Sequence, residues 1–201
     1  MAKSVRAATL LWVDRMIIGH NLCPYTAAVR KRSGALACRI STADSVQTFL
    51  ADLDDEALSL SEGPAETSLV ALAPCTDWAR GLHTSFSEFM SLGWVVEDHL
   101  QERQLSTELQ LALFHPLAVR NLYASGDAEA EDFAMKAPHP TVHLLRTADV
   151  QAVPTASAAA VPERNRTRLR GLGLEKLADE LRALQDEAAS EAVSKAARDR
   201  G

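Results

Sequence analysis

The sequence predicts an α/β domain with a small, mostly parallel sheet of three to four strands, helices packed on that sheet and a helical C-terminus. Apolar residues recur at helical spacing over residues 4–18 and 46–60. Segments 36–40 and 109–113 alternate apolar side chains with others, as strands do. Segment 68–73 is continuously apolar, as expected of a strand covered on both faces. Strands separated by helices of this length can pair in parallel through right-handed crossovers.

In the first half of the chain, predicted helices alternate with predicted strands. The helix over residues 4–18 ends at Gly19, and a strand follows at 36–40. Asp44 can cap the next helix, which ends before the Gly63–Pro64 pair.

The middle of the chain contains the core of the predicted sheet. Segment 68–73 is expected to be its central strand. A third helix presents apolar side chains from Phe86 to Leu100 and leads to the strand at 109–113. From Leu117 to Pro140 the apolar residues follow neither the helical nor the strand period, and a segment of that length without regular structure is usually functional or disordered.

The last third is expected to be helical after one more strand. Residues 141–146 fit a fourth strand better than a first helical turn, and Thr147 can cap a helix after it. Residues 155–161 are small and unpatterned, which indicates a linker. Pro162 suits a first helical position and Gly171 a C-terminal cap, before a last helix whose leucines begin at Leu174.

Size and composition favour one globular unit. The chain has 201 residues, 47% of them hydrophobic and 24% charged, which is ordinary for a single domain. We expect residues 1–188 to form that domain and residues 189–201 to be a frayed tail. The formal charge of −6 argues against a nucleic-acid partner, which needs a basic face.

The cysteines and the N-terminal apolar stretch indicate the cellular compartment in which the protein is expected. Cys23, Cys38 and Cys75 form no C-x-x-C pair and are odd in number, which does not fit a disulfide framework or a zinc site. The apolar stretch 10–18 is interrupted by charges and too short to span a bilayer. A cytoplasmic protein without a membrane partner is therefore expected.

Four segments, in the same order over nearly the whole chain, resemble one family. They read NLCPY (21–25), FHP (114–116), APHPTVHLLR (137–146) and PERN (162–165). The chain thereby resembles the mainly bacterial family catalogued as domain of unknown function 1415. The resemblance implies a shared fold and no established activity.

The chain departs from that family in one loop. Asp132, Met135, Lys136 and Ala137 stand where similar proteins have asparagines, an arginine and a serine, and Thr147 replaces a glutamate. If those polar groups formed a site, half of it is lost or rebuilt in this chain.

Three residues are candidates for catalysis. Cys23 follows a helix on a loop stiffened by proline, and its thiolate would be a nucleophile beside a histidine; the alternative is a buried, inert thiol. His115 follows a strand at the edge where open α/β sheets bind ligands, and it can be a base, a metal ligand or a hydrogen-bond donor; the alternative is a contact to a loop carbonyl. His143 has the same alternatives. A metal held by these histidines and Asp132 has no supporting spacing, so no metal is predicted.

Four residues are candidates for ligand binding. Arg146 and Arg164 can bind an anion through their guanidinium forks, and Arg164 is expected in the first turn of a helix, which also favours anions. The alternative for Arg164 is an ion pair. Asn21 and Asn165 are retained by position in the resemblance, although Asn165 can simply satisfy a loop backbone.

The sequence therefore predicts an enzyme or binding domain for a small anionic metabolite. Its Cys/His/Arg site would lie at the C-terminal edge of the sheet. The alternative is a non-catalytic interaction module that docks a partner through the proline-rich loop and the C-terminal leucine helix. Glycine-rich phosphate loops, G-x-S-x-G and H-E-x-x-H motifs are absent, and no cofactor is singled out.

Overall fold

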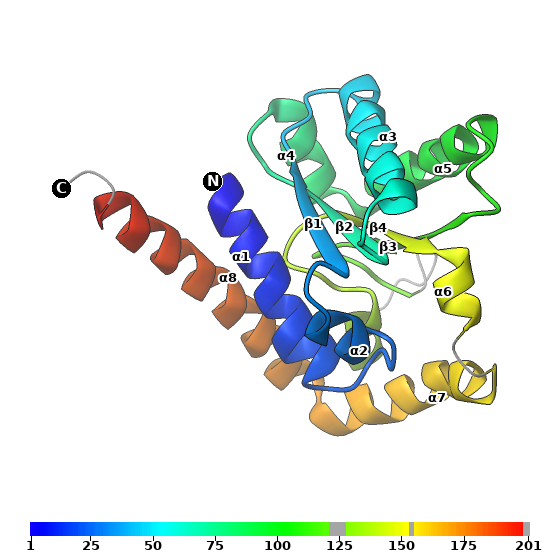
Figure 1. Ribbon diagram of the computed structural model, residues 1–201. Coiled ribbons are helices and arrows are strands. Elements are labelled where there is room, and N and C mark those ends of the chain that lie inside the picture. Colours follow the sequence, from blue (N-terminus) through cyan, green and yellow to red (C-terminus); the bar gives the residue numbers. More distant parts are fainter. Residues whose placement is uncertain (121–127, 153–154, 199–201) are drawn as a thin grey trace.

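The computed structural model describes residues 1–120, 128–152 and 155–198. Its core is one four-stranded sheet with strand order β1-β2-β4-β3 and helices on both faces (Figure 1). The strands are β1 (Leu36–Ser41), β2 (Thr67–Leu72), β3 (Leu109–Phe114) and β4 (Thr141–Arg146). The α/β class and the helical C-terminus are thus confirmed, and residues 141–146 form a strand as predicted.

The sheet is mixed, so the expectation of a mostly parallel sheet is wrong. Strands β1 and β2 are parallel, whereas β4 runs antiparallel to both β2 and β3. Among the described residues between β3 and β4, the one helical element is the short 3₁₀ turn η2 (Ala130–Ala134), and β4 lies beside β3 in the opposite direction. Strand β2, which is buried along its whole length, is an inner strand, as its continuous apolar run predicted.

Three helices cover one face of the sheet. They are α3 (Val46–Glu62), α4 (Asp77–Thr84) and α5 (Phe86–Glu102). Val70 and Leu72 of β2 belong to the same buried cluster as Phe49 of α3 and Phe89 of α5. The expected third helix, with apolar side chains from Phe86 to Leu100, is α5, whereas the shorter α4 before it was not predicted. The extended Ser85 separates the two helices and caps α5. Ser45, not Asp44, caps α3, since its hydroxyl accepts a hydrogen bond from the Thr48 amide.

Helices from both ends of the chain, together with one 3₁₀ turn from the segment between β3 and β4, cover the other face. They are α1 (Ala2–Trp12), the π-helical turn η1 (Val13–Ile18), α2 (Thr26–Lys31), the 3₁₀ turn η2 (Ala130–Ala134), α7 (Thr155–Leu172) and α8 (Leu174–Arg198). Helices α1 and α8 lie side by side and run in opposite directions (Figure 1). Leu177 and Leu184 of α8 are buried with Trp12 and Met16, so the leucine face of the last helix packs within the chain.

The region after β4 differs from the sequence prediction. The short helix α6 (Thr147–Gln151) begins at Thr147 itself, with Arg146 at its N-cap. Residues 155–161, expected to be a linker, are the start of α7, and Pro162 lies inside this helix. Gly173, which has a φ of 84°, follows the end of α7 in place of the predicted Gly171.

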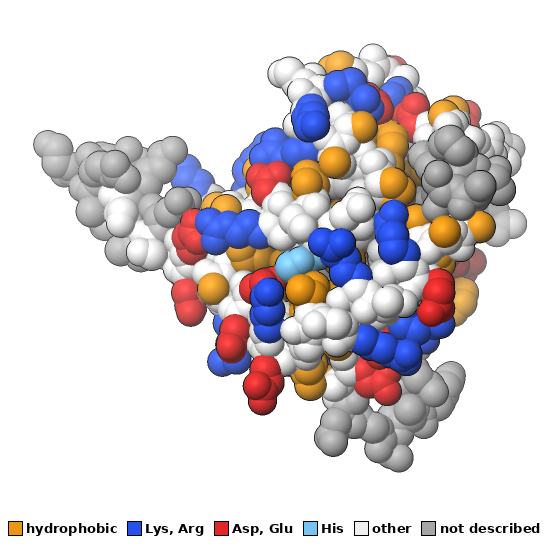
Figure 2. Space-filling model, turned by 90° about the horizontal axis from the view of Figure 1, so that it is seen from below, with side chains coloured by type: hydrophobic (Ala, Val, Ile, Leu, Met, Phe, Trp, Pro, Cys, Tyr) orange, Lys and Arg blue, Asp and Glu red, His pale blue; other side chains and the backbone are white. Residues whose placement is uncertain are grey.

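The described residues include no helix that is both long and apolar enough to cross a membrane. Seen from the side of α2 and α7, acidic and basic side chains are interspersed, with hydrophobic side chains exposed between them (Figure 2). Helix α8 continues past the buried Ala188 to Arg198, and the domain boundary at residue 188 stays a prediction.

Candidate functional site

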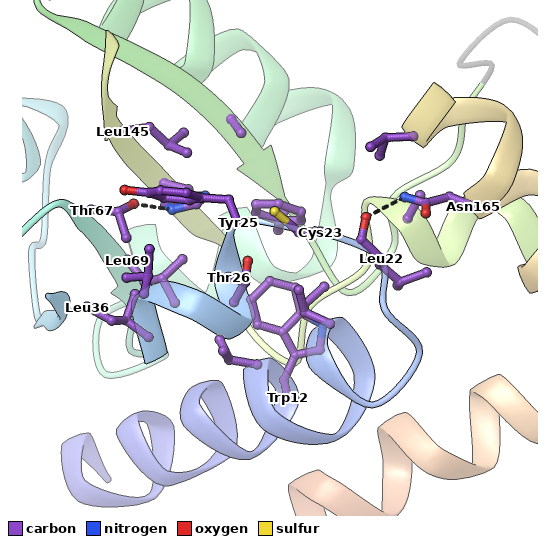
Figure 3. A pocket seen from close by; sticks show the side chains of 18 residues that line it. Trp12, Leu22, Cys23, Tyr25, Thr26, Leu36, Thr67, Leu69, Leu145 and Asn165 are labelled. Atoms are coloured by element: carbon purple, nitrogen blue, oxygen red, sulfur yellow. Dashed lines mark hydrogen bonds between the residues drawn. The ribbon is translucent and has the colours of Figure 1, made fainter. Parts of the chain in front are cut away.

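A cavity of about 280 Å³ lies between the sheet and the helices formed by the two ends of the chain. All four strands contribute to its floor, with Leu36, Thr67, Leu69, Ala112, Phe114, His143 and Leu145. Its walls come from α1, η1, the loop after η1, α2, η2 and α7, with Trp12, Val13, Ile17, Leu22, Cys23, Tyr25, Thr26, Val29, Ala134, Val161 and Asn165. Figure 3 shows these side chains around a common space. Most of them are apolar.

The loop after η1 carries Cys23 into the cavity wall. The Leu22 amide donates to the Ile17 carbonyl over 2.8 Å, and Asn21 has a φ of 48°, so the chain turns sharply back over the sheet. Pro24 then restricts the backbone of Cys23 to extended conformations. The Cys23 thiol is partly buried, and within the described part of the chain it makes no hydrogen bond.

Helix α7 holds this loop in place through two hydrogen bonds. The Asn165 side-chain amide donates to the Leu22 carbonyl over 2.7 Å, and the Arg164 guanidinium donates to the Asn21 carbonyl over 2.9 Å (Figure 3 shows the first contact). These two contacts join residues 143 positions apart in sequence. We call this pair of contacts the clasp. Arg164 lies in the interior of α7, not in its first turn, so the helix N-terminus argument for an anion does not apply to it.

His143 and Thr67 are the polar side chains on the floor of the cavity. Nε2 of His143 lies 2.5 Å from the Thr67 hydroxyl oxygen, and that hydroxyl also lies 2.8 Å from the Leu144 carbonyl oxygen, to which it donates. Burial lowers the pKa of His143 to about 4, so the ring is neutral at physiological pH.

The structure does not bring His115 to this cavity. Its fully buried ring packs between Phe86 and Phe89, with centroid distances of 5.4 and 5.3 Å, on the opposite face of the sheet. One ring nitrogen contacts the Leu82 carbonyl oxygen over 2.7 Å, and the other accepts from the Leu117 amide over 3.0 Å. Both nitrogens therefore have protein partners, as in the alternative of a loop contact, and burial lowers the pKa of the ring.

Arg146 lies outside the cavity lining, in a cluster of charges near Tyr25. The guanidinium of Arg146 contacts the Asp149 carboxylate over 2.7 Å. The Tyr25 hydroxyl donates to Glu66 over 3.0 Å, and Arg32 contacts the same carboxylate through two nitrogens. Arg32, the Tyr25 hydroxyl and Arg146 all hold the pKa of Glu66 below its usual value, Arg32 most strongly.

The predicted site residues thus separate into four places, one of which is the charge cluster near Tyr25 that contains Arg146. Cys23, His143 and Asn165 line the cavity, Asn21 and Arg164 form its clasp with Asn165, and His115 lies across the sheet. The cavity lies over the face of the sheet and not at its C-terminal edge, because Leu36 and Thr67 in its floor are the first residues of their strands.

Sequence reasoning missed three polar residues of the cavity, which are Tyr25, Thr26 and Thr67. Tyr25 ends the NLCPY segment, two positions after the candidate nucleophile Cys23. This proximity is the signal by which Tyr25 could have been found. Thr67 precedes an apolar run and gives no such signal, because its contact with His143 depends on the pairing of β2 with β4.

Asp132, the carboxylate that was considered as a metal ligand, instead caps backbone amides of its own region. It accepts hydrogen bonds from the amides of Arg120 and Glu129, over 2.9 and 2.8 Å. Within residues 1–120, 128–152 and 155–198, no group of three His, Cys, Asp or Glu side chains could hold a metal ion.

Comparison with protein families supplies one match. The model of a family described as protein of unknown function (DUF1415) matches residues 4–179. The chain belongs to this family. The match confirms the resemblance and includes every residue of the DUF1415 chain that lines the cavity or forms its clasp. No curated protein and no solved structure matches the sequence.

Proposed function

We propose that this protein binds a small, mainly apolar molecule in the cavity between its sheet and its terminal helices. The observation that carries the proposal is the lining of the cavity, which is apolar apart from a few side chains that include Cys23, Thr26 and His143. Ligand sites are commonly concave, mainly apolar and supplied with a few polar groups that orient the ligand. A volume of about 280 Å³ suits a molecule of fragment size.

Filling the cavity is expected to weaken binding. Ala112 lies in the floor, and the Ala112→Leu substitution places three extra carbons there, so fragments that bind the wild type should bind the variant at least about tenfold more weakly, as expected when a ligand clashes with its site. Ligand-observed NMR with a library of neutral, cationic and anionic fragments measures this effect.

The matched control is Ala51→Leu, which makes the same change on the exposed side of α3 and should leave binding unaltered. Fragments that bind Ala112→Leu as tightly as the wild type contradict the proposed site. So does a library without any ligand at millimolar concentration.

The anionic ligand expected from the sequence is a second candidate. It is supported by the charge cluster near Tyr25, where Arg32 and Arg146 are neighbours of Glu66. A carboxylate group would have to displace Glu66 or Asp149 from these guanidinium groups.

The interaction module expected from the sequence is less well supported. The leucine face of α8 is already covered by α1, so a partner protein would need another surface.

A catalytic form of the proposal uses Cys23 as nucleophile and His143 as base. It is supported by the presence of both side chains in one cavity lining. Because His143 is neutral, it would accept the thiol proton as the bond to the electrophile forms, in general-base fashion.

Removal of His143 is then expected to slow alkylation of Cys23. The rate with a neutral maleimide, followed by mass spectrometry across a pH series, should fall about tenfold or more in His143→Ala. His99→Ala is the control, since His99 pairs with Asp54 on the other side of the sheet. Equal rates in the wild type and His143→Ala would leave Cys23 as an unassisted thiol.

A further inference from the structure

We infer that the cavity selects a neutral, mainly apolar ligand that donates a hydrogen bond to Nδ1 of His143. The inference rests on the proposed function and names the class of ligand. It comes from the hydrogen-bond roles of His143, Thr67 and the Leu144 carbonyl, which together fix where the single ring proton lies.

The Thr67 hydroxyl has one proton and two close neighbours. The Leu144 carbonyl oxygen, 2.8 Å away, can only accept, so the hydroxyl proton points to it. The second neighbour, Nε2 of His143 at 2.5 Å, must therefore be the donor. A neutral imidazole carries one N–H, and this contact places it on Nε2. Nδ1 consequently keeps a lone pair.

Nδ1 of His143 is available to a ligand. Among the described residues it has no hydrogen-bond partner, and the ring lines the cavity. Within a mainly apolar lining, a ligand N–H or O–H that meets this lone pair exchanges its hydrogen bond to water for one to the protein.

None of the remaining polar groups of the lining is a cation that could pair with an anionic ligand. The Tyr25 hydroxyl donates to Glu66, and one N–H of the Asn165 amide donates to the Leu22 carbonyl. The buried indole Nε1 of Trp12, a neutral donor, has no hydrogen-bond partner among the described residues. The lining contains no lysine or arginine. A ligand carboxylate in this space would lose its hydration without gaining a cationic partner, which is strongly unfavourable.

Thr67 is accordingly a positioning residue and His143 the group that selects the ligand. Thr67 sets both the orientation of the ring and the nitrogen that carries the proton, as outer partners of histidine do in other sites. Its replacement should therefore change the tautomer, which a merely space-filling role would not do.

The tautomer is measured by ¹⁵N NMR of the histidine rings, with His143→Leu used to assign the signals. We expect a protonated Nε2 and an unprotonated Nδ1 in the wild type at neutral pH. In Thr67→Val, which removes the acceptor and retains the branched shape, a substantial share of the proton should move to Nδ1. A wild-type ring protonated on Nδ1 overturns the inference, whether or not any ligand binds.

Ligand class is measured with three molecules of one shape: 4-propylphenol, propylbenzene and 4-propylbenzoate. By NMR titration the phenol should bind the wild type about fivefold to tenfold more tightly than propylbenzene, as one hydrogen bond provides, and the benzoate should bind most weakly. In His143→Leu the preference for the phenol should disappear while propylbenzene still binds.

The outcomes separate this inference from the proposed function. Tightest binding of the benzoate, or a phenol preference that survives in His143→Leu, overturns the ligand class but leaves the cavity as a binding site. Failure of all three molecules to bind counts against the cavity as a site for such molecules, and the ligand class then falls with it.

Discussion

Truncation of Leu72 to alanine is expected to lower the free energy of unfolding by about 2 to 5 kcal/mol. Leu72 ends the inner strand β2 and is fully buried in the cluster formed with α3, α4 and α5. The substitution removes apolar contacts and leaves a hole that the close-packed helices can fill only in part. Chemical denaturation measures the loss, which should appear as a lower midpoint at an unchanged slope.

Leu58→Ala is the matched control for this substitution. Leu58 lies on α3 and is 56% exposed, so the same truncation there should change stability by no more than about 0.5 kcal/mol. A loss below about 1 kcal/mol for Leu72→Ala would show that β2 is not the centre of the core.

Mild acid is expected to destabilise the fold through two histidines. Burial lowers the pKa of His139 and of His143 to about 4, from a usual value of 6.5. The unfolded chain therefore binds more protons than the folded one below pH 6.5, and stability falls as the pH drops from about 6.5 to about 4. Linkage gives a loss of about 2 kcal/mol per histidine at pH 5.

Denaturation at a series of pH values tests this expectation. His139→Asn should remove a substantial part of the slope between pH 7 and pH 5. His143, the partly buried His83 and the buried His115, whose pKa values are also lowered, retain the rest. Asp54 and Glu66 are held by their arginines with lowered pKa values, so their contribution is lost only in more acidic solution. Stability that is flat from pH 7 to pH 5 would contradict the burial of His139 and His143.

Sequence patterns predicted the elements whose signals are local. The apolar run of β2 and the helical spacing in α1 and α3 each reflect a face that the element itself must bury. The start of α7 carried a different local signal, because its alanines favour a helix by intrinsic propensity without forming an apolar stripe. A prediction based on apolar stripes alone therefore assigned this segment as a linker.

The direction of β4 and the partners of the candidate residues depend on tertiary structure. No local period distinguishes a strand that returns beside β3 from one that crosses over the sheet. Likewise, His115 and His143 both lie among prolines in the sequence, yet one meets the Leu82 carbonyl and the other the Thr67 hydroxyl. Only the sheet register and the packing of α4 decide between these environments.

The clasp also affects when the cavity can form during synthesis. Asn21 and Leu22 leave the ribosome early, but Arg164 and Asn165, which hold their carbonyls, follow 143 residues later. At roughly 5 to 20 residues per second, translation separates the two halves of the clasp by about seven to thirty seconds. During that interval the loop that carries Cys23 lacks its α7 partners, and the wall of the cavity is incomplete. The nascent chain therefore completes the wall of the cavity only after the strands and helices between the two halves of the clasp have been made.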